Sequence, residues 1–256
     1  MVAQTIFYTP QFTVMKAPSI PRDEIISFKK LRAFIGFTGI LLPIVVVLGC
    51  YLLGAGQYSF QHSVSHYYYT LMHIVFVSIL CVLGGFLITY RGKDHWESRV
   101  SNLAGFSAFG IAAFPTSFLG FQPEHDGMNQ YLRLLRGVTG FGGSLHYAFA
   151  SLLFICFIIF CLYFFQKPDE HYTGVEEVKF KRRKIVYTIS GWVIIISIIM
   201  IPLIGFVIKP QKGIFVYSTF IFETTSLWAF GTAWLVKGSA ALKKMPVVRR
   251  LVHPLR

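Results

Sequence analysis

Six long apolar runs dominate the chain, and each is close to the roughly 20 residues that a helix needs to cross the hydrocarbon core of a bilayer. Shorter segments with more polar and charged residues separate them. The pattern predicts an all-α integral membrane protein built as a six-helix transmembrane bundle. The runs are about Ala33–Gly56, Tyr67–Tyr90, Arg99–Phe121, Gly140–Phe165, Ile185–Ile208 and Phe215–Val236.

The flanks of this predicted domain, 33–236, differ from it in composition. Residues 1–32 form an N-terminal segment, in which acids precede bases between Pro21 and Arg32. That order suits a helix dipole, so we expect a short helix there on the membrane surface. Residues 237–256 form a basic tail, which we expect in the cytoplasm.

Three prolines lie inside the predicted spans, at Pro43, Pro115 and Pro202. In a membrane helix, proline predicts a kink more often than a helix end. The third span also carries Ala104, Ala108 and Ala112 at four-residue spacing. Such a ridge of small residues lets a second helix approach closely. Packing within the monomer is favoured, and a homo-oligomer is the alternative.

Composition narrows the class further. Of 256 residues, 54% are hydrophobic and 14% are charged, which is too few charges to cover a soluble domain. Membrane lipids are therefore the expected surroundings. The net charge of +13 does not indicate nucleic-acid binding, because the basic residues cluster beside the apolar runs. The four cysteines all lie inside apolar runs, so buried thiols are predicted.

The basic residues also predict an orientation in the cell membrane. With the N-terminus inside, the segments that face outward hold only Arg133, Arg136, Lys209 and Lys212. All the other Lys and Arg residues then lie on the cytoplasmic side, as the positive-inside rule requires. An even number of spans returns the C-terminus to the same side. A multi-pass protein with both termini in the cytoplasm is expected.

The candidate chemistry begins in the segment from Ser63 to His73. Read as one helix, it places His62, His66, Tyr69 and His73 on one face. His73, His146 and Glu223 lie at a similar predicted depth, roughly 9 to 12 Å below the outer rim. An isolated carboxylate in lipid is costly, so Glu223 should face the interior and pair with His73 or His146.

These residues predict an outward-facing polar cavity between spans two, four and six. Imidazole and carboxylate suit zinc, so His66, His73 and His146 are candidate metal ligands. Glu223 would act as the base, with Ser65 as a further catalytic candidate. The Glu124, His125 and Asp126 side chains, in the long outer loop between the third and fourth predicted spans, could complete the site.

Two structural interpretations compete with this site. Tyr67, Tyr68 and Tyr69 are interpreted as an aromatic belt at the headgroup level, where tyrosine is enriched. His73, His146 and Glu223 could equally form a hydrogen-bonded cluster that only ties spans together. His62 and His125 are expected to be solvated loop residues.

Four segments carry a resemblance to a group of uncharacterised bacterial six-span membrane proteins with an S-x-S-[D/H]-Y-Y motif. In that group an aspartate often stands where this chain has His66, and an Arg-Asp pair stands near Met72 and His73. The resemblance implies the six-span fold but no established activity. The segments are S-V-S-H-Y-Y-Y at 63–69, S-N-L-A-G-F-S-A-F-G-I-A-A-F-P-T at 101–116, L-H-Y-A-F-A at 145–150 and E-T-T-S-L-W-A-F-G-T-A-W-L-V-K-G at 223–238.

A more distant resemblance is to the alkaline ceramidases and the progestin and adipoQ receptors. It rests on Ser65 with His66 or His73, and it implies a zinc-activated water that acts on a lipid amide. That family has seven spans and two histidines in the last span, where this chain has Glu223.

Three functions therefore remain open. The first is a membrane protein of unknown activity that binds a lipid or small ligand in the His/Glu cavity. The second is a metal-dependent intramembrane hydrolase. The third is a haem or quinone electron-transfer protein with histidines on spans two and four as axial ligands.

The orientation can be tested by cysteine labelling. In a background without native cysteines, Gly127→Cys should react with an impermeant thiol reagent on intact cells and Gly174→Cys should not, because the positive-inside rule places them on opposite sides. The opposite labelling pattern would overturn the orientation.

Overall fold

The computed structural model describes residues 22–54, 60–117, 139–168, 174–208 and 214–242. Within these ranges all regular secondary structure is helical, which confirms the all-α prediction. The α-helices are α1 (Arg22–Leu53), α2 (His73–Thr89), α3 (His95–Ala113), α5 (Thr139–Ile159), α6 (Val175–Pro202) and α7 (Ser218–Leu242). The 3₁₀ helices are η1 (Val64–Tyr69) and η4 (Ile214–Tyr217), and the π-helices are η2 (Phe160–Phe164) and η3 (Leu203–Ile208).

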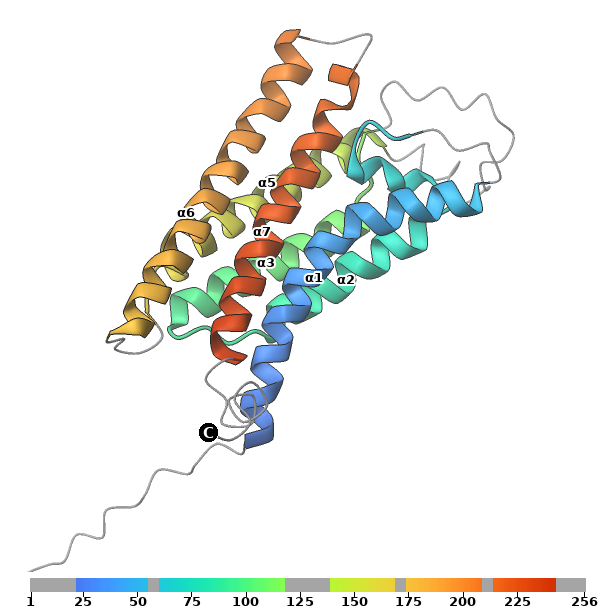
Figure 1. Cartoon of the computed structure of the whole chain (residues 1–256). Helices are drawn as coiled ribbons and strands as arrows, with labels where there is room; N and C mark the ends of the chain where they lie inside the picture. The colour runs from blue at the N-terminus through green and yellow to red at the C-terminus, as the bar shows by residue number, and fades with distance from the viewer. Residues whose placement is uncertain (1–21, 55–59, 118–138, 169–173, 209–213, 243–256) are drawn as a thin grey trace, which may run out of the picture.

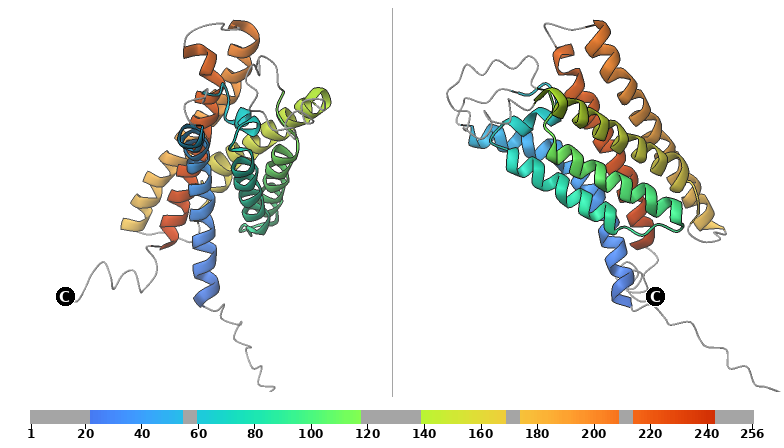
Figure 2. Two further views of the ribbon diagram at one scale, coloured as in Figure 1. Left: turned by 90° about the vertical axis from the view of Figure 1, so that its right-hand side faces the viewer. Right: turned by 180° about the vertical axis from the view of Figure 1, so that it is seen from behind.

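The long helices run back and forth along one common direction (Figures 1 and 2). Each packs against the next one in the chain, from α1 through α2, α3, α5 and α6 to α7. Helix α7 then packs extensively against α1, which closes the bundle. Because each long helix runs opposite to the one before it, residues far apart in the chain meet at each end of the bundle.

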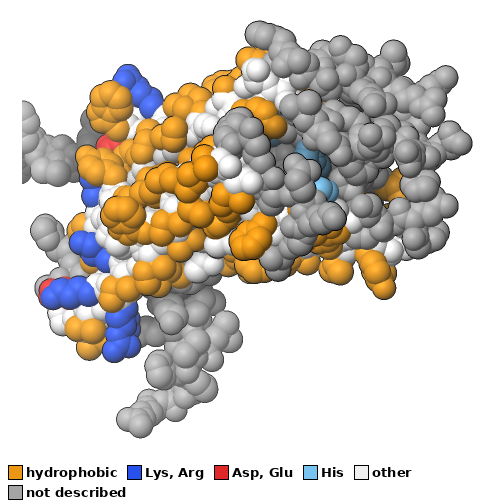
Figure 3. Space-filling view, turned by 90° about the horizontal axis from the view of Figure 1, so that it is seen from above, with side chains coloured by type: hydrophobic (Ala, Val, Ile, Leu, Met, Phe, Trp, Pro, Cys, Tyr) orange, Lys and Arg blue, Asp and Glu red, His pale blue; other side chains and the backbone are white. Residues whose placement is uncertain are grey.

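Two ends of the bundle differ in chemistry. The basic end comprises Arg32, residues 90–99, 163–168 and 180–184, and Lys237. The histidine end comprises residues 60–73, 114–117, His146 and residues 217–223. Figure 3 shows Lys and Arg side chains gathered at one end of the visible face, with hydrophobic side chains along the length beyond them.

Aromatic side chains fill the middle of the bundle. Phe157 of α5 and Phe230 of α7 stack with their ring centroids 3.4 Å apart. Toward the basic end, Trp234 contacts Tyr90 and Phe160 at 5.0 and 5.2 Å between centroids. These rings are fully buried, and large rings in such geometry contribute more than their buried area alone.

Two glycine pairs allow neighbouring helices to touch through their backbones. A Cβ on Gly84 of α2 would lie 2.9 Å from the carbonyl oxygen of Gly105 on α3, and the reverse distance is 2.7 Å. Gly36 of α1 and Gly231 of α7 are related in the same way. The ridge that includes Ala104 and Ala108 is buried beside Gly105, which confirms the prediction of packing within the monomer.

Three described helical segments are long and apolar enough to cross a membrane: Lys30–Leu53, Gly143–Phe164 and Val175–Gly205. Helix α2 is apolar but shorter. The chain is therefore compatible with a membrane protein. Many large apolar side chains on the outside of α6 are exposed, among them Ile189, Trp192 and Ile196.

Some local predictions differ from the structure. The surface helix expected between Pro21 and Arg32 is continuous with the first long helix, and Pro43 lies within that helix. Pro115 does not kink a helix, because α3 already ends at Ala113. Pro202 closes α6, and a π-helix follows it. The prediction of buried thiols is confirmed for Cys50, Cys156 and Cys161, whereas Cys81 is only partly buried; all four cysteines are free.

The Gly84–Gly105 contact yields a matched prediction on one helix. Gly84→Ala should destabilise the protein by about 1–3 kcal/mol, because the added methyl group would push α2 and α3 apart. Gly85→Ala is the control, because nothing lies within 4 Å of its Cβ position. Thermal unfolding in detergent would measure both. Equal melting temperatures for the two variants would contradict the close contact.

Candidate functional site

The segment before α2 does not form one continuous helix. Residues Val64–Tyr69 form the 3₁₀ helix η1, and α2 begins only at His73. Thr70 adopts an extended backbone between them, and its hydroxyl donates to the carbonyl of Tyr67 at 2.8 Å. The prediction that His62, His66, Tyr69 and His73 share one helix face is therefore wrong.

Glu223 of α7 holds the start of η1. Its Oε2 atom accepts a hydrogen bond from the Ser63 hydroxyl at 2.8 Å and one from the Val64 N–H at 2.6 Å. Ser65 also hydrogen-bonds to this carboxylate. The Ser63 hydroxyl in turn accepts the Ser65 N–H at 3.0 Å. A carboxylate on one helix thus caps the first turn of another element.

The partners of Glu223 differ from the prediction. The sequence indicates a pair with His73 or His146, but the carboxylate oxygen is occupied by Ser63 and Val64. Charge-assisted hydrogen bonds to backbone and hydroxyl donors compensate for burying a carboxylate as an imidazole would. The carboxylate is therefore anchored without a histidine partner.

The rest of η1 faces inward and meets the end of α3. Tyr67, Tyr68 and Tyr69 are 0%, 4% and 7% exposed, so their interpretation as a belt at the headgroup level is wrong. The Tyr69 hydroxyl donates to the carbonyl of Thr116 at 2.7 Å. The imidazole of His66 hydrogen-bonds to the backbone of Ser117. Because α3 stops at Ala113, residues 114–117 offer backbone carbonyls to these side chains.

Two predicted ligand histidines have a defined tautomer. Nδ1 of His73 lies 2.6 Å from the Tyr68 carbonyl oxygen, and Nδ1 of His146 lies 2.8 Å from that of Phe114. A carbonyl oxygen only accepts, so each Nδ1 carries the proton. In the neutral ring, Nε2 then holds the lone pair that could accept a hydrogen bond or bind a metal ion.

The predicted metal ligands do not form a complete cluster in the described part of the chain. There, no three His, Cys, Asp or Glu side chains are grouped closely enough to hold a metal ion. His66 lies near enough to His62 and His146 for their charges to interact. Glu124, His125 and Asp126 lie outside the described residues, and His62 is exposed as expected.

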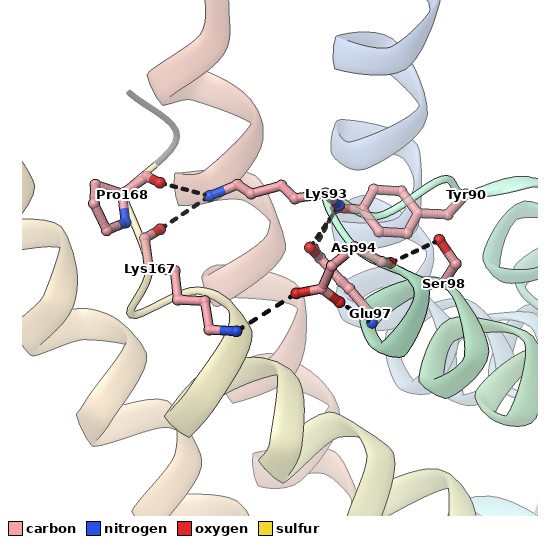
Figure 4. A network of polar contacts seen from close by, with 7 residues as sticks. All are labelled: Tyr90, Lys93, Asp94, Glu97, Ser98, Lys167 and Pro168. Atoms are coloured by element: carbon pink, nitrogen blue, oxygen red, sulfur yellow. Dashed lines mark hydrogen bonds and ion pairs between the residues drawn. The ribbon is translucent and has the colours of Figure 1, made fainter. Parts of the chain in front are cut away.

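Sequence reasoning missed a buried polar network at the basic end, drawn in Figure 4. Glu97 is 1% exposed, and its Oε1 atom accepts the Tyr90 hydroxyl at 2.8 Å. Its Oε2 atom accepts the Lys93 N–H at 2.9 Å. From α1, Arg32 donates to the Tyr90 hydroxyl at 3.2 Å. The D-x-x-E spacing of Asp94 and Glu97, typical of a capping box, is the signal that could have located this network.

Asp94 completes the start of α3. Its carboxylate accepts the Glu97 N–H at 2.8 Å and lies 3.5 Å from the Lys167 ammonium. The hydrogen bond from Glu97 lowers the pKa of Asp94 below its ordinary value, and Lys167 adds to the effect. Lys93 donates to the carbonyls of Lys167 and Pro168. The loop before α3 is thereby tied to the residues after η2.

Comparisons of this chain with protein-family models, with curated proteins and with solved structures find no match. The function must therefore be argued from the residues themselves.

The Glu223 contact yields a prediction on stability. Glu223→Leu should destabilise the protein by about 1–3 kcal/mol for each buried donor that it leaves unpaired. Glu223→Gln should cost less, because the amide oxygen can still accept. Ser63→Ala should cost about 1 kcal/mol, because it removes one donor and the cap on Ser65. Thermal unfolding would rank the three variants.

Thr225→Ala is the control on the same helix. Thr225 is exposed, and its hydroxyl bonds only to the Ile221 carbonyl one turn earlier, so the melting temperature should not change. A Glu223→Leu protein as stable as this control would show that the carboxylate does not hold η1.

Proposed function

We propose that the chain is a six-span protein of the cell membrane, with both termini in the cytoplasm, that binds a polar ligand at its histidine end without converting it. The up-and-down order of the long helices and their apolar exteriors support insertion. The predicted charge asymmetry supports the orientation. The resemblance to the six-span group with the S-x-S-[D/H]-Y-Y motif agrees with this architecture.

One observation carries the choice of binding over catalysis. The Glu223 carboxylate is engaged by Ser63 and Val64, so the residue that a hydrolase would need as its base serves to anchor η1. A general base must be within reach of the proton that it takes. Releasing Glu223 for that task would leave the Val64 N–H without its acceptor.

The proposed ligand carries hydroxyl or amine donors. In the neutral ring of His146, a side chain that is only 1% exposed, Nε2 is the acceptor, because Nδ1 donates to the Phe114 carbonyl. The His66 ring is fixed by Ser117 in the same neighbourhood. A polar lipid or a small molecule with donor groups would satisfy these ring nitrogens at little cost in ordering the site.

A second candidate, the metal-dependent lipid hydrolase, has one observation in its favour. Histidine ligands of metals usually donate their second ring nitrogen to a carbonyl or carboxylate, as His73 and His146 do here. His66, His73 and His146 are not grouped closely enough to hold a metal ion as they lie, so this candidate requires them to move together before a bound zinc could activate water. Metal analysis separates this candidate from the first.

The experiment uses the full chain purified in mild detergent without chelators. Molecules that copurify are identified by mass spectrometry, and zinc is measured by elemental analysis. We expect a donor-bearing ligand in about equimolar amount on the wild type, a marked loss of it on His66→Leu and His146→Leu, and retention on the control His62→Gln. We expect no stoichiometric zinc.

Three kinds of result would overturn this proposal. Stoichiometric zinc that disappears in His66→Leu and His146→Leu would establish the metal site instead. A ligand retained equally by every variant, or no copurifying ligand at all, would leave the histidines with a structural role. A Soret absorption band, which is the mark of bound haem, would establish the electron-transfer alternative.

A further inference from the structure

The exposed part of the basic end combines cations with amphipathic aromatic rings. Trp96 at the start of α3 and Tyr163 in η2 are 67% and 55% exposed. The Arg99 guanidinium lies 5.3 Å from the centre of the Trp96 ring. The Lys167 ammonium lies 4.1 Å from the centre of the Tyr163 ring. Each ring thus makes a cation–π contact with one basic side chain.

The segments that carry these two pairs are in contact with each other. Helix α3 packs against α5, and α5 continues directly into η2. The ion pair between Asp94 and Lys167 spans the two sides, and Lys93 reaches the Lys167 and Pro168 carbonyls (Figure 4). On the interior side, the buried Glu97 carboxylate holds the loop before α3 through its hydrogen bonds to Tyr90 and Lys93. The surface is therefore held in shape by contacts other than those that a ligand would use.

The charge of this surface is positive. Its charged side chains among the described residues are the exposed Arg91, Lys93 and Arg99 and the partly exposed Lys167, against the exposed Asp94. Trp and Tyr at a membrane boundary lie at the level of the lipid headgroups, and each nearby Lys or Arg attracts anionic lipid. Arginine in addition matches the oxygens of a phosphate.

We propose that this surface, the headgroup site, binds the phosphate-bearing headgroup of an anionic phospholipid. Arg91 and Arg99 supply charge and hydrogen bonds to the phosphate, and Trp96 and Tyr163 lie against the upper part of the lipid. The site rests on the proposed insertion in a membrane, but it does not depend on a ligand at the histidine end.

The test compares two pairs of charge-neutralising variants in detergent. Phosphatidylglycerol or phosphatidylcholine with the same acyl chains is added, and the rise in melting temperature is followed against lipid concentration. Phosphatidylglycerol should stabilise the wild type at lower concentrations than phosphatidylcholine. Arg91→Gln with Arg99→Gln should raise the half-saturating concentration of phosphatidylglycerol by roughly tenfold or more.

The matched control is Arg182→Gln with Lys184→Gln. These exposed residues lie at the same end on α6, and their loss changes the net charge equally. The control pair should shift the half-saturating concentration by less than about threefold, because only the general surface potential changes. Trp96→Ala, which keeps every charge, should also weaken the selectivity for phosphatidylglycerol.

Three outcomes would overturn the headgroup site: equal effects of the two variant pairs, no preference for phosphatidylglycerol over phosphatidylcholine, or no effect of Trp96→Ala. Inorganic phosphate serves as a further arm, because stabilisation by phosphate alone would assign the surface to a soluble anion. Cysteine labelling at both ends in cells checks insertion separately, so failure of the membrane proposal is distinguishable.

Discussion

The hydrogen bonds of the Glu223 carboxylate determine how the histidine end is built. They connect α7 to the first turn of η1, and the backbone contact from Phe220 N–H to the His62 carbonyl at 2.9 Å adds to them. Because η1 is only six residues long, its own hydrogen bonds could not position it. With its start held by α7, its tyrosines are directed into the bundle and toward residues 114–117.

The early end of α3 has a matching role. It leaves the Phe114 and Thr116 carbonyls free to accept from His146 and Tyr69. Pro115 cannot donate a backbone hydrogen bond, which favours the break at this position. A carboxylate on α7 and a broken helix end thus organise one polar region, and the imidazoles take their orientation from it.

The two ends are linked by helices that pack closely. Gly36 and Gly231 bring α1 and α7 into backbone contact, and the same two helices carry Arg32 and Lys237 at the basic end. Toward that end, Trp234 of α7 lies on Tyr90, whose hydroxyl joins Arg32 to Glu97. The packing of α1 against α7 therefore fixes the positions of the side chains at both the histidine end and the basic end. Variants at one end test that end without changing the polar residues of the other.

The sequence by itself determined the all-helical class, the compatibility with a membrane, the burial of three of the four cysteines and the packing role of the alanine ridge. These follow from hydrophobicity and residue size, which act over one helix at a time. Only the tertiary structure decided that Glu223 caps η1, that Tyr67–Tyr69 are buried and that Glu97 is paired with Tyr90. Each of these depends on which segments meet, and a hydrogen bond between residues 160 positions apart, such as that from Ser63 to Glu223, leaves no periodic signal in the chain.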